Sequence, residues 1–272
     1  MPRPRNAMEV FKWLDKSNCR KCGEKTCLAF AGAVFQGRRS ISECPVLNPE
    51  IRKRFADAET GGNVAERNRD EAMAKLKAAF GGLDFAEAAA RTGGRVEENR
   101  LILKILGKDF SVDRNGNLAS DIHINPWVAV PFMMYILYGK GKPVTGNWLS
   151  FRDLKEGRER YGLFQKRCEE PMKQVADSYT ELFDDMVHLF GGRQVPEQFE
   201  SDVSVVLHPL PKVPIMVCYW SNEDGLESSL NLFFDESVND NLDIGSVFSL
   251  AAGLAQMFQK LSLRHGIQAE NA

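Results

Sequence analysis

The chain has 272 residues, of which 43% are hydrophobic and 26% are charged. This is the composition of a globular protein that can bury a full core, and it excludes a disordered or fibrous chain. The longest apolar run, 127–138, contains Pro131 and is too short to span a bilayer. No secretory signal is visible, and six cysteines in a chain of this length do not suggest a disulfide scaffold. We therefore expect a cytoplasmic protein without a membrane span.

The formal net charge of −2 hides an uneven distribution of charge along the chain. Residues 1–54 carry 12 of the 35 basic residues and 5 of the 37 acidic residues, a net +7. Residues 55–272 carry the other 23 basic and 32 acidic residues, a net −9. The basic part could steer an acidic redox partner, or it could rest on the acidic remainder of the chain. Nucleic acid is not an expected partner, because no RNA-binding signature or helix-turn-helix pattern is present.

The first predicted elements are two short helices, over 7–14 and 25–35, around a cysteine-rich loop. Four cysteines follow the spacing Cys-x2-Cys-x4-Cys-x16-Cys, and a proline comes after the last: Cys19, Cys22, Cys27 and Cys44. Thiolate sulfur is the preferred ligand of iron–sulfur clusters, and a [4Fe–4S] cluster takes four. The pattern therefore predicts that these cysteines bind one [4Fe–4S] cluster.

Zinc is the alternative metal, because it also accepts sites made of four cysteines. Zinc ribbons usually pair two short Cys-x2-Cys knuckles, and this chain has one, so the spacing favours the cluster. Four basic residues flank the ligands directly: Lys16, Arg20, Lys21 and Lys25. Positive charge near a cluster favours its reduced form and raises its potential.

The residues around the cysteines resemble a known family. The stretch 10–47 contains Asn-Cys-Arg-Lys-Cys-Gly-Glu-Lys-Thr-Cys-Leu-Ala-Phe-Ala, then Gln-Gly, then Cys-Pro. It is similar to the small [4Fe–4S] domain of the large subunit of the corrinoid iron–sulfur protein, and to a related domain in the B subunit of the Rnf electron-transport complex. The resemblance implies that the four matching cysteines bind one low-potential cluster. It covers about 40 residues, and no corrinoid-binding barrel fits in this chain.

A polar stretch at 55–70, which contains Gly61-Gly62, is predicted to link a cluster-binding module at 1–54 to a second domain at 71–272. Strands in hairpins between separated helices indicate an α+β domain with a mostly antiparallel sheet and packed helices. The predicted helices cover 71–80, 85–92, 126–138, 172–190 and 242–265. The predicted strands cover 100–106, 109–113, 203–207, 214–220 and 229–234.

The second domain resembles an uncharacterised family, the domain of unknown function numbered 3786, over about 73–263. Three runs carry this resemblance: Val-Thr-Gly-Asn-Trp-Leu-Ser-Phe from Val144, Pro-Leu-Pro-Lys-Val-Pro from Pro209, and Leu-Phe-Phe-Asp from Leu232. The family brings no activity to this chain. It does occur fused to this type of cluster module, which supports the two-part interpretation.

No catalytic residue is predicted in the second domain. Its histidines are scattered without metal-ligand spacing: His123, His188, His208 and His265. His188 is expected to be structural, and His208 could face a pocket at a strand end. Cys168 and Cys218 lie far from the cysteine motif, and we expect Cys218 to be a buried core thiol. Gly-Lys-Gly-Lys from Gly139 lacks the order of a phosphate-binding loop and predicts a turn that ends a helix.

The sequence therefore predicts a [4Fe–4S] protein that transfers single electrons or reductively activates a partner enzyme, with a corrinoid-dependent system as one plausible client. The alternative is an enzyme whose second domain binds a small molecule and uses the cluster as an electron input. A third option is a sensor or structural cluster. An accessory protein is favoured over a stand-alone enzyme.

Overall fold

The computed structural model describes residues 6–36, 38–51, 64–121, 123–179, 181–196, 198–223 and 225–269. The chain falls into two compact units, Met1–Lys75 and Leu76–Ala272. The division lies within helix α4, Val64–Ala79. Its first residues belong to the stretch 55–70 that we expected to be a linker, and residues 52–63 lie outside the described part. The sequence of α4 is polar but rich in Ala, Glu, Arg and Lys, which favour helix, so the second half of this polar stretch is helical.

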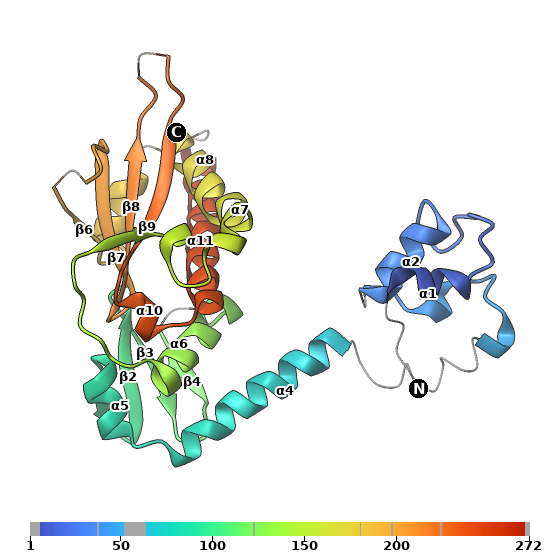
Figure 1. Ribbon diagram of the computed structural model, residues 1–272, viewed down its shortest axis with the longest axis horizontal. Helices are drawn as coiled ribbons and strands as arrows, with labels where there is room; N and C mark the ends of the chain where they lie inside the picture. Colours follow the sequence, from blue (N-terminus) through green and yellow to red (C-terminus); the bar gives the residue numbers. More distant parts are fainter. Residues whose placement is uncertain are drawn as a thin grey trace. The chain divides into compact units, whose positions relative to one another are not determined.

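The first unit contains two short helices, α1 (Ala7–Lys12) and α2 (Cys27–Phe35), and a 3-10 turn, η1 (Ile41–Glu43). Figure 1 shows α1 and α2 packed against each other. Each helix begins with a side-chain cap: Asn6 accepts the N–H of Glu9, and Thr26 accepts the N–H of Ala29, both at 3.1 Å. The small core consists of Val10, Leu14, Cys27, Phe30, Ala31, Ile41, Cys44 and Leu47.

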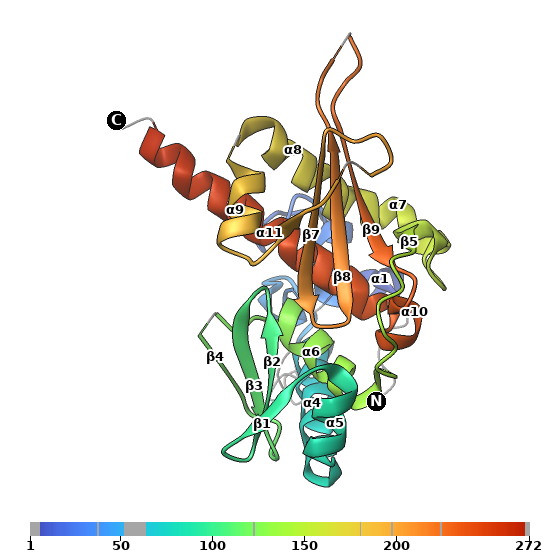
Figure 2. The ribbon, with the colours of Figure 1, turned by 90° about the vertical axis from the view of Figure 1, so that its left-hand side faces the viewer.

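The smaller sheet of the second unit is antiparallel, with the strand order β1-β2-β3-β4. Its strands are β1 (Arg95–Glu97), β2 (Arg100–Ile105), β3 (Lys108–Asp113) and β4 (Leu118–Ser120). Helices α5 (Phe85–Thr92) and α6 (Pro126–Tyr138) lie beside it (Figure 2). Phe110 of β3 packs against Phe132 of α6 with ring centroids 4.7 Å apart, which ties helix to sheet.

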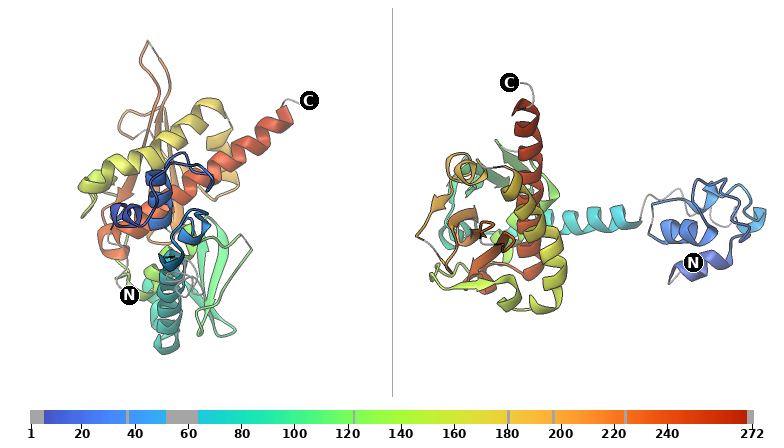
Figure 3. Two further views of the ribbon diagram at one scale, coloured as in Figure 1. Left: turned by 90° about the vertical axis from the view of Figure 1, so that its right-hand side faces the viewer. Right: turned by 90° about the horizontal axis from the view of Figure 1, so that it is seen from above.

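The larger sheet is also antiparallel, with the order β5-β9-β8-β7-β6. Its strands are β5 (Trp148–Ser150), β6 (Arg193–Gln194), β7 (Val203–Leu210), β8 (Val213–Trp220) and β9 (Ser229–Asp235). Two helices cover one face, α8 (Glu170–Ser178) and the long α11 (Ile244–Ala269), as Figures 2 and 3 show from opposite sides. The two sheets meet where the Leu106 N–H donates to the His208 carbonyl at 3.0 Å.

The remaining helical segments are short, and two of them contribute rings to an aromatic core. Phe151 and Phe164 stack with ring centroids 3.9 Å apart, and the ring of Phe234 meets both at an edge. All three side chains are fully buried, so these rings are core rather than binding surface. The segments are η2 (Phe80–Gly82), η3 (Phe151–Asp153), η4 (Arg158–Arg160), α7 (Tyr161–Phe164), the π-helical η5 (Gln165–Glu169), α9 (Leu182–His188) and α10 (Val238–Asn241).

The predicted α+β class with antiparallel sheets and packed helices is confirmed. The predicted single helix over 172–190 is wrong, because the chain leaves the helix at Tyr179, whose backbone is extended. The Ser178 hydroxyl donates to the carbonyl of Gln174 at 2.8 Å, a local bond that competes with continued helix. In the described part of the chain, no helix is both long enough and apolar enough to cross a membrane.

Candidate metal centre

The loop that carries the first three cysteines has an unusual backbone. Lys16, Asn18 and Arg20 have positive φ angles of 63°, 51° and 60°, and Gly23 has a φ of 84°. Such angles are uncommon outside glycine, and asparagine tolerates them best among the other residues. The Gly23 N–H donates to the Arg20 carbonyl at 3.0 Å and closes a tight turn. The chain therefore coils tightly where the cysteine ligands are predicted.

Asn18 fixes the end of this loop on helix α2. Its Oδ1 accepts the backbone N–H of Cys27 at 2.7 Å, across nine residues. Cys27 is the first residue of α2, where unpaired N–H groups and the helix dipole favour negative charge. Asn18 therefore ties the cysteine loop to the first residue of α2.

The fourth cysteine is held by a separate turn. In η1 the Ser40 side chain accepts the N–H of Ser42 at 3.0 Å, and Glu43 accepts the N–H of Ser40 at 2.8 Å, which forms a capping box. The N–H of Cys44 donates to the Ile41 carbonyl at 3.2 Å, so the turn sets the direction in which the chain enters this residue.

The four thiols differ in their exposure to solvent. Cys27 and Cys44 are buried in the core of the first unit, Cys22 is half-buried and packs against that core, and Cys19 is exposed. Burial raises the pKa of Cys44, and the charges of Cys22, Cys19 and Cys27 raise it further. Each thiol is therefore within electrostatic reach of Cys44.

Four mutually repelling thiolates need a positive centre between them, and deprotonated sulfur is the donor that iron–sulfur clusters and zinc both take. The donor set therefore fits a thiolate-bound metal group. In a cubane each thiolate binds its own iron, whereas a single ion needs its ligands around one point. Within the described residues, no three His, Cys, Asp or Glu side chains converge closely enough to hold a metal ion.

The cysteine loop presents positive charge to solvent. Four side chains of its basic residues are exposed: Lys16, Arg20, Lys21 and Lys25. Two apolar side chains that follow predicted ligands are also exposed, Leu28 by 49% and Val46 by 40%. The surface near the predicted ligands therefore combines positive charge with apolar area.

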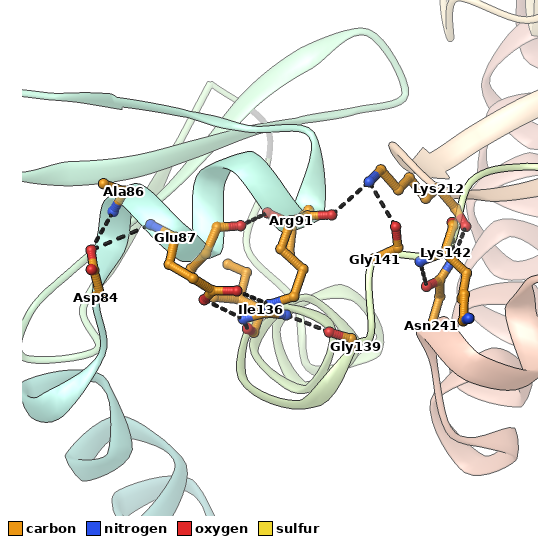
Figure 4. Close-up of polar contacts among 12 residues, drawn as sticks. Asp84, Ala86, Glu87, Arg91, Ile136, Gly139, Gly141, Lys142, Lys212 and Asn241 are labelled. Carbon is orange, nitrogen blue, oxygen red and sulfur yellow. Dashed lines mark hydrogen bonds and ion pairs between the residues drawn. The ribbon is translucent and has the colours of Figure 1, made fainter.

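In the second unit, polar side chains bond to backbone groups at helix ends, as Figure 4 shows for helices α5 and α6. Arg91, in the last turn of α5, forms an ion pair with Glu87 at 2.7 Å. Its guanidinium also donates to two carbonyls at the end of α6, those of Ile136 (3.0 Å) and Gly139. Arg91 thus satisfies carbonyls that α6 leaves unpaired at its C-terminus.

Lys212 satisfies a backbone carbonyl at the C-terminal end of α5. Its Nζ donates to the carbonyl of Arg91 at 2.7 Å and to that of Gly141 at 2.9 Å (Figure 4). The Asn241 amide then donates to the carbonyls of Lys142 and Lys212 at 2.9 and 3.0 Å. A Cβ at Gly141 would overlap the Arg91 carbonyl. Helix α6 ends at Tyr138 and Gly139 is extended, so the helix ends where the glycines predicted, but with an extended residue rather than a turn.

Asp235 is the most completely bonded carboxylate of this unit. It is fully buried and accepts the N–H groups of Thr145 (3.0 Å), Gly146 (2.6 Å) and Ser237 (3.0 Å). Burial raises its pKa, but these hydrogen bonds outweigh burial and lower the pKa below the usual value. Asp235 therefore anchors the loop before β5 to the end of β9.

Two cavities open on the second unit. One, of about 330 Å³, contains Lys140 and Asp240, whose side chains pair at 2.6 Å. The other, of about 390 Å³, is lined by acidic residues, among them Asp202, whose carboxylate accepts two hydrogen bonds from Ser221. The charged groups named here are engaged with neighbouring residues.

The remaining candidates of the second unit do not gather into a site. His123, His188 and His208 are exposed, and the side chain of His265 lies outside the described residues. His208 does not line either of the two cavities described above. Cys168 and Cys218 are fully buried, and burial raises the pKa of both thiols. The predicted core thiol at Cys218 is confirmed.

Sequence reasoning missed the polar residues that stabilise the fold within each unit. Asn18, Asp235 and Lys212 lie inside the runs that carried the family resemblances, so the residues were noticed without their roles. Arg91 and Asn241 lie outside those runs, and only tertiary packing brings them to their carbonyl partners.

Two known families match this chain, and each match lies within one of the two compact units. Residues 14–46 match the family described as "Putative Fe-S cluster", and residues 84–257 match the family described as "Domain of unknown function (DUF3786)". The first match spans all four cysteines of the motif and supports an iron–sulfur cofactor. The second match covers more than half of the residues, and the chain belongs to the DUF3786 family.

Curated relatives match the cysteine-containing part. The gamma subunit of the acetyl-CoA decarbonylase/synthase complex of Methanocaldococcus jannaschii is 43% identical over 54 residues, 20% of this chain and 11% of that protein. The corrinoid/iron-sulfur protein large subunit of Moorella thermoacetica is 40% identical over 50 residues, 18% and 11% of the two chains. Gamma subunit 1 of Methanosarcina thermophila is 34% identical over 87 residues, 32% and 16%. The chain thus spans a small part of each relative. No solved structure matches.

Proposed function

We propose that Cys19, Cys22, Cys27 and Cys44 bind one [4Fe–4S] cluster and that this protein passes single electrons to a partner. When bound, such a cluster takes up and releases one electron at a time. The observation that carries the proposal is that three of these cysteines belong to, or pack against, one small core. The chain's own residues bind the cluster and shield it on the side of Cys27 and Cys44.

The exposed side of the site faces the partner in this proposal. Cys19 is exposed, so the electron leaves or enters near the surface. The basic residues around Cys19 and Cys22 favour an acidic partner protein, because opposite charges speed diffusional encounter. The name of one relative, a corrinoid/iron-sulfur protein, supports a corrinoid-dependent system as the client.

The second unit serves as a docking domain in this proposal. The basic and acidic side chains described above cap helices, close turns or pair with each other, which is the behaviour of a scaffold. All six cysteines are free of disulfides, which suits a reducing compartment, and we assign the protein to the cytoplasm.

The redox activity is tested on protein purified without oxygen. EPR spectra before and after dithionite should show a silent oxidised state and a reduced state with the signal of a one-electron-reduced cubane. Re-oxidation should restore the silent state without loss of iron. Zinc at about one ion per chain, with no dithionite-dependent signal, would contradict the proposal and leave a structural metal.

The proposed partner charge is tested with small oxidants of opposite charge. Stopped-flow oxidation of the reduced protein should be faster with the ferricyanide anion than with the cobalt hexaammine cation, after correction for driving force. The preference should shrink at high salt, where exposed charges are screened. The double variant Lys21→Glu, Lys25→Glu should lose the preference, and an unchanged preference would contradict an acidic partner.

A further inference from the structure

Arg39 joins the two segments that carry the cysteines. Its Nη1 lies 2.5 Å from Oε2 of Glu43, the residue directly before Cys44. Its Nε lies 4.0 Å from Oε1 of Glu24, two residues after Cys22. One guanidinium therefore contacts a neighbour of the fourth cysteine and a neighbour of the second.

The guanidinium also lies against the cysteine loop itself. A Cβ placed on Gly23 would be 3.2 Å from Nη2 of Arg39, and Gly23 directly follows Cys22. The hydrogen bond and charge of Glu43 raise the pKa of Arg39, and the charges of Glu24 and Cys22 add to this. Arg39 is thus a permanent positive charge held beside one of the thiols.

We propose that Arg39 is a positioning residue that ties the loop 19–27 to Cys44 and raises the reduction potential of the bound cluster. This inference rests on the proposed cluster. A fixed positive charge stabilises the more negative, reduced form. Without Arg39, the carboxylates of Glu24 and Glu43 remain beside the ligands and act in the opposite direction.

Arg38 offers a matched control. It is the adjacent residue with the same charge, but its guanidinium donates to the Gln36 side chain at 2.5 and 2.9 Å. The variants Arg38→Gln and Arg39→Gln remove the same formal charge from neighbouring positions. Only Arg39→Gln removes the contacts to Glu43 and Glu24.

The test is an EPR-monitored redox titration of the holoprotein and three variants at low and high salt. At the wild-type midpoint potential, the ratio of reduced to oxidised cluster in Arg39→Gln should be about threefold lower than in the wild type, which is a shift of about 28 mV at 59 mV per tenfold for one electron. Arg39→Lys should recover most of this shift, and Arg38→Gln should stay near the wild type. High salt should reduce the difference.

A second readout follows the joining role. Arg39→Gln should lose iron to a chelator faster than Arg38→Gln, because the turn before Cys44 no longer has the ion pair between residue 39 and Glu43. If Arg39→Gln assembles too little cluster for titration, Glu24→Gln carries the test, since removing that carboxylate should raise the potential.

The outcomes separate this inference from the function on which it rests. A wild-type protein without iron and sulfide overturns both. A wild-type cluster with equal potentials and equal iron loss in Arg39→Gln and Arg38→Gln overturns the role of Arg39 alone. No upward shift in Glu24→Gln also overturns it.

Discussion

The two units of this protein use polar side chains for different ends. In the second unit Arg91 and Lys212 cap helix ends, and Asp235 anchors a loop. Their charged groups therefore form hydrogen bonds that stabilise the fold. In the first unit Asn18 and the capping box of η1 hold the backbone around thiols that bond to no other cysteine. Polar side chains thus stabilise the fold in one unit and hold the backbone around the predicted ligands in the other.

Positive charge shows the same contrast. Lys212 is half-buried and reaches two backbone carbonyls, whereas Lys16 and Lys21 stand exposed beside the cysteine loop. A cation that satisfies carbonyls contributes to stability, and an exposed cation contributes to the field that a partner meets. Loss of charge should therefore change folding in one unit and redox behaviour in the other.

The largest expected effect is the loss of a ligand. Cys44→Ser should abolish the broad visible absorbance of the cluster and its iron content, because hydroxyl oxygen replaces a buried thiolate ligand. Cys218→Ala, at a fully buried thiol of the second unit, should keep both. Spectra and iron assays of the two variants check this, and full iron retention in Cys44→Ser would contradict the ligand assignment.

The next effect tests the second unit. Asp235→Ala leaves the buried N–H groups of Thr145, Gly146 and Ser237 without their acceptor, and each unpaired group costs about 1–3 kcal/mol. We expect a loss of about 3 kcal/mol or more in the free energy of unfolding of this unit. Urea unfolding followed by tryptophan fluorescence measures it. A loss below about 1 kcal/mol would show that the anchor is weak.

Glycine substitutions test the close contact between α5 and the segment after α6. Gly141 has a φ of 69°, and a Cβ there would overlap the Arg91 carbonyl, so Gly141→Ala should cost about 2–4 kcal/mol. Gly146 has a φ of 82° but open space around it, so Gly146→Ala should cost only about 1–2 kcal/mol. Equal thermal shifts in the two variants would argue against the contact.

The smallest expected effect is a dependence on acid. The folded-state pKa of Asp235 is lowered, so its contribution to stability is present above the unfolded value of about 3.9 and is lost as pH falls through the folded value. The stability difference between the wild type and Asp235→Asn should therefore shrink between about pH 5 and pH 2. Unfolding curves across this range measure it, and a constant difference would contradict an ionised Asp235.

Much of the fold could be predicted from local pattern. The helices over 85–92 and 126–138 were predicted at the observed bounds, because capping residues and glycines mark their ends. The two-residue strand β6 and the three-residue strand β5 were not predicted, because short edge strands depend on their partners rather than on their own residues.

The site shows the same limit. The spacing of the cysteines predicted the ligand set, but it carried no information on Arg39, whose role depends on the approach of two segments separated by a helix. Asn18 could have been suspected, since asparagine before a turn tolerates a positive φ and accepts backbone N–H groups. The polar joints around Arg91 and Lys212 depend on contacts across more than 40 residues, which pattern alone does not encode.

The proposed [4Fe–4S] cluster is tested by the iron, acid-labile sulfide and zinc content of protein purified without oxygen. We expect about four iron and four sulfide per chain, with little zinc. Zinc at about one per chain without sulfide, or no bound metal at all, would contradict it.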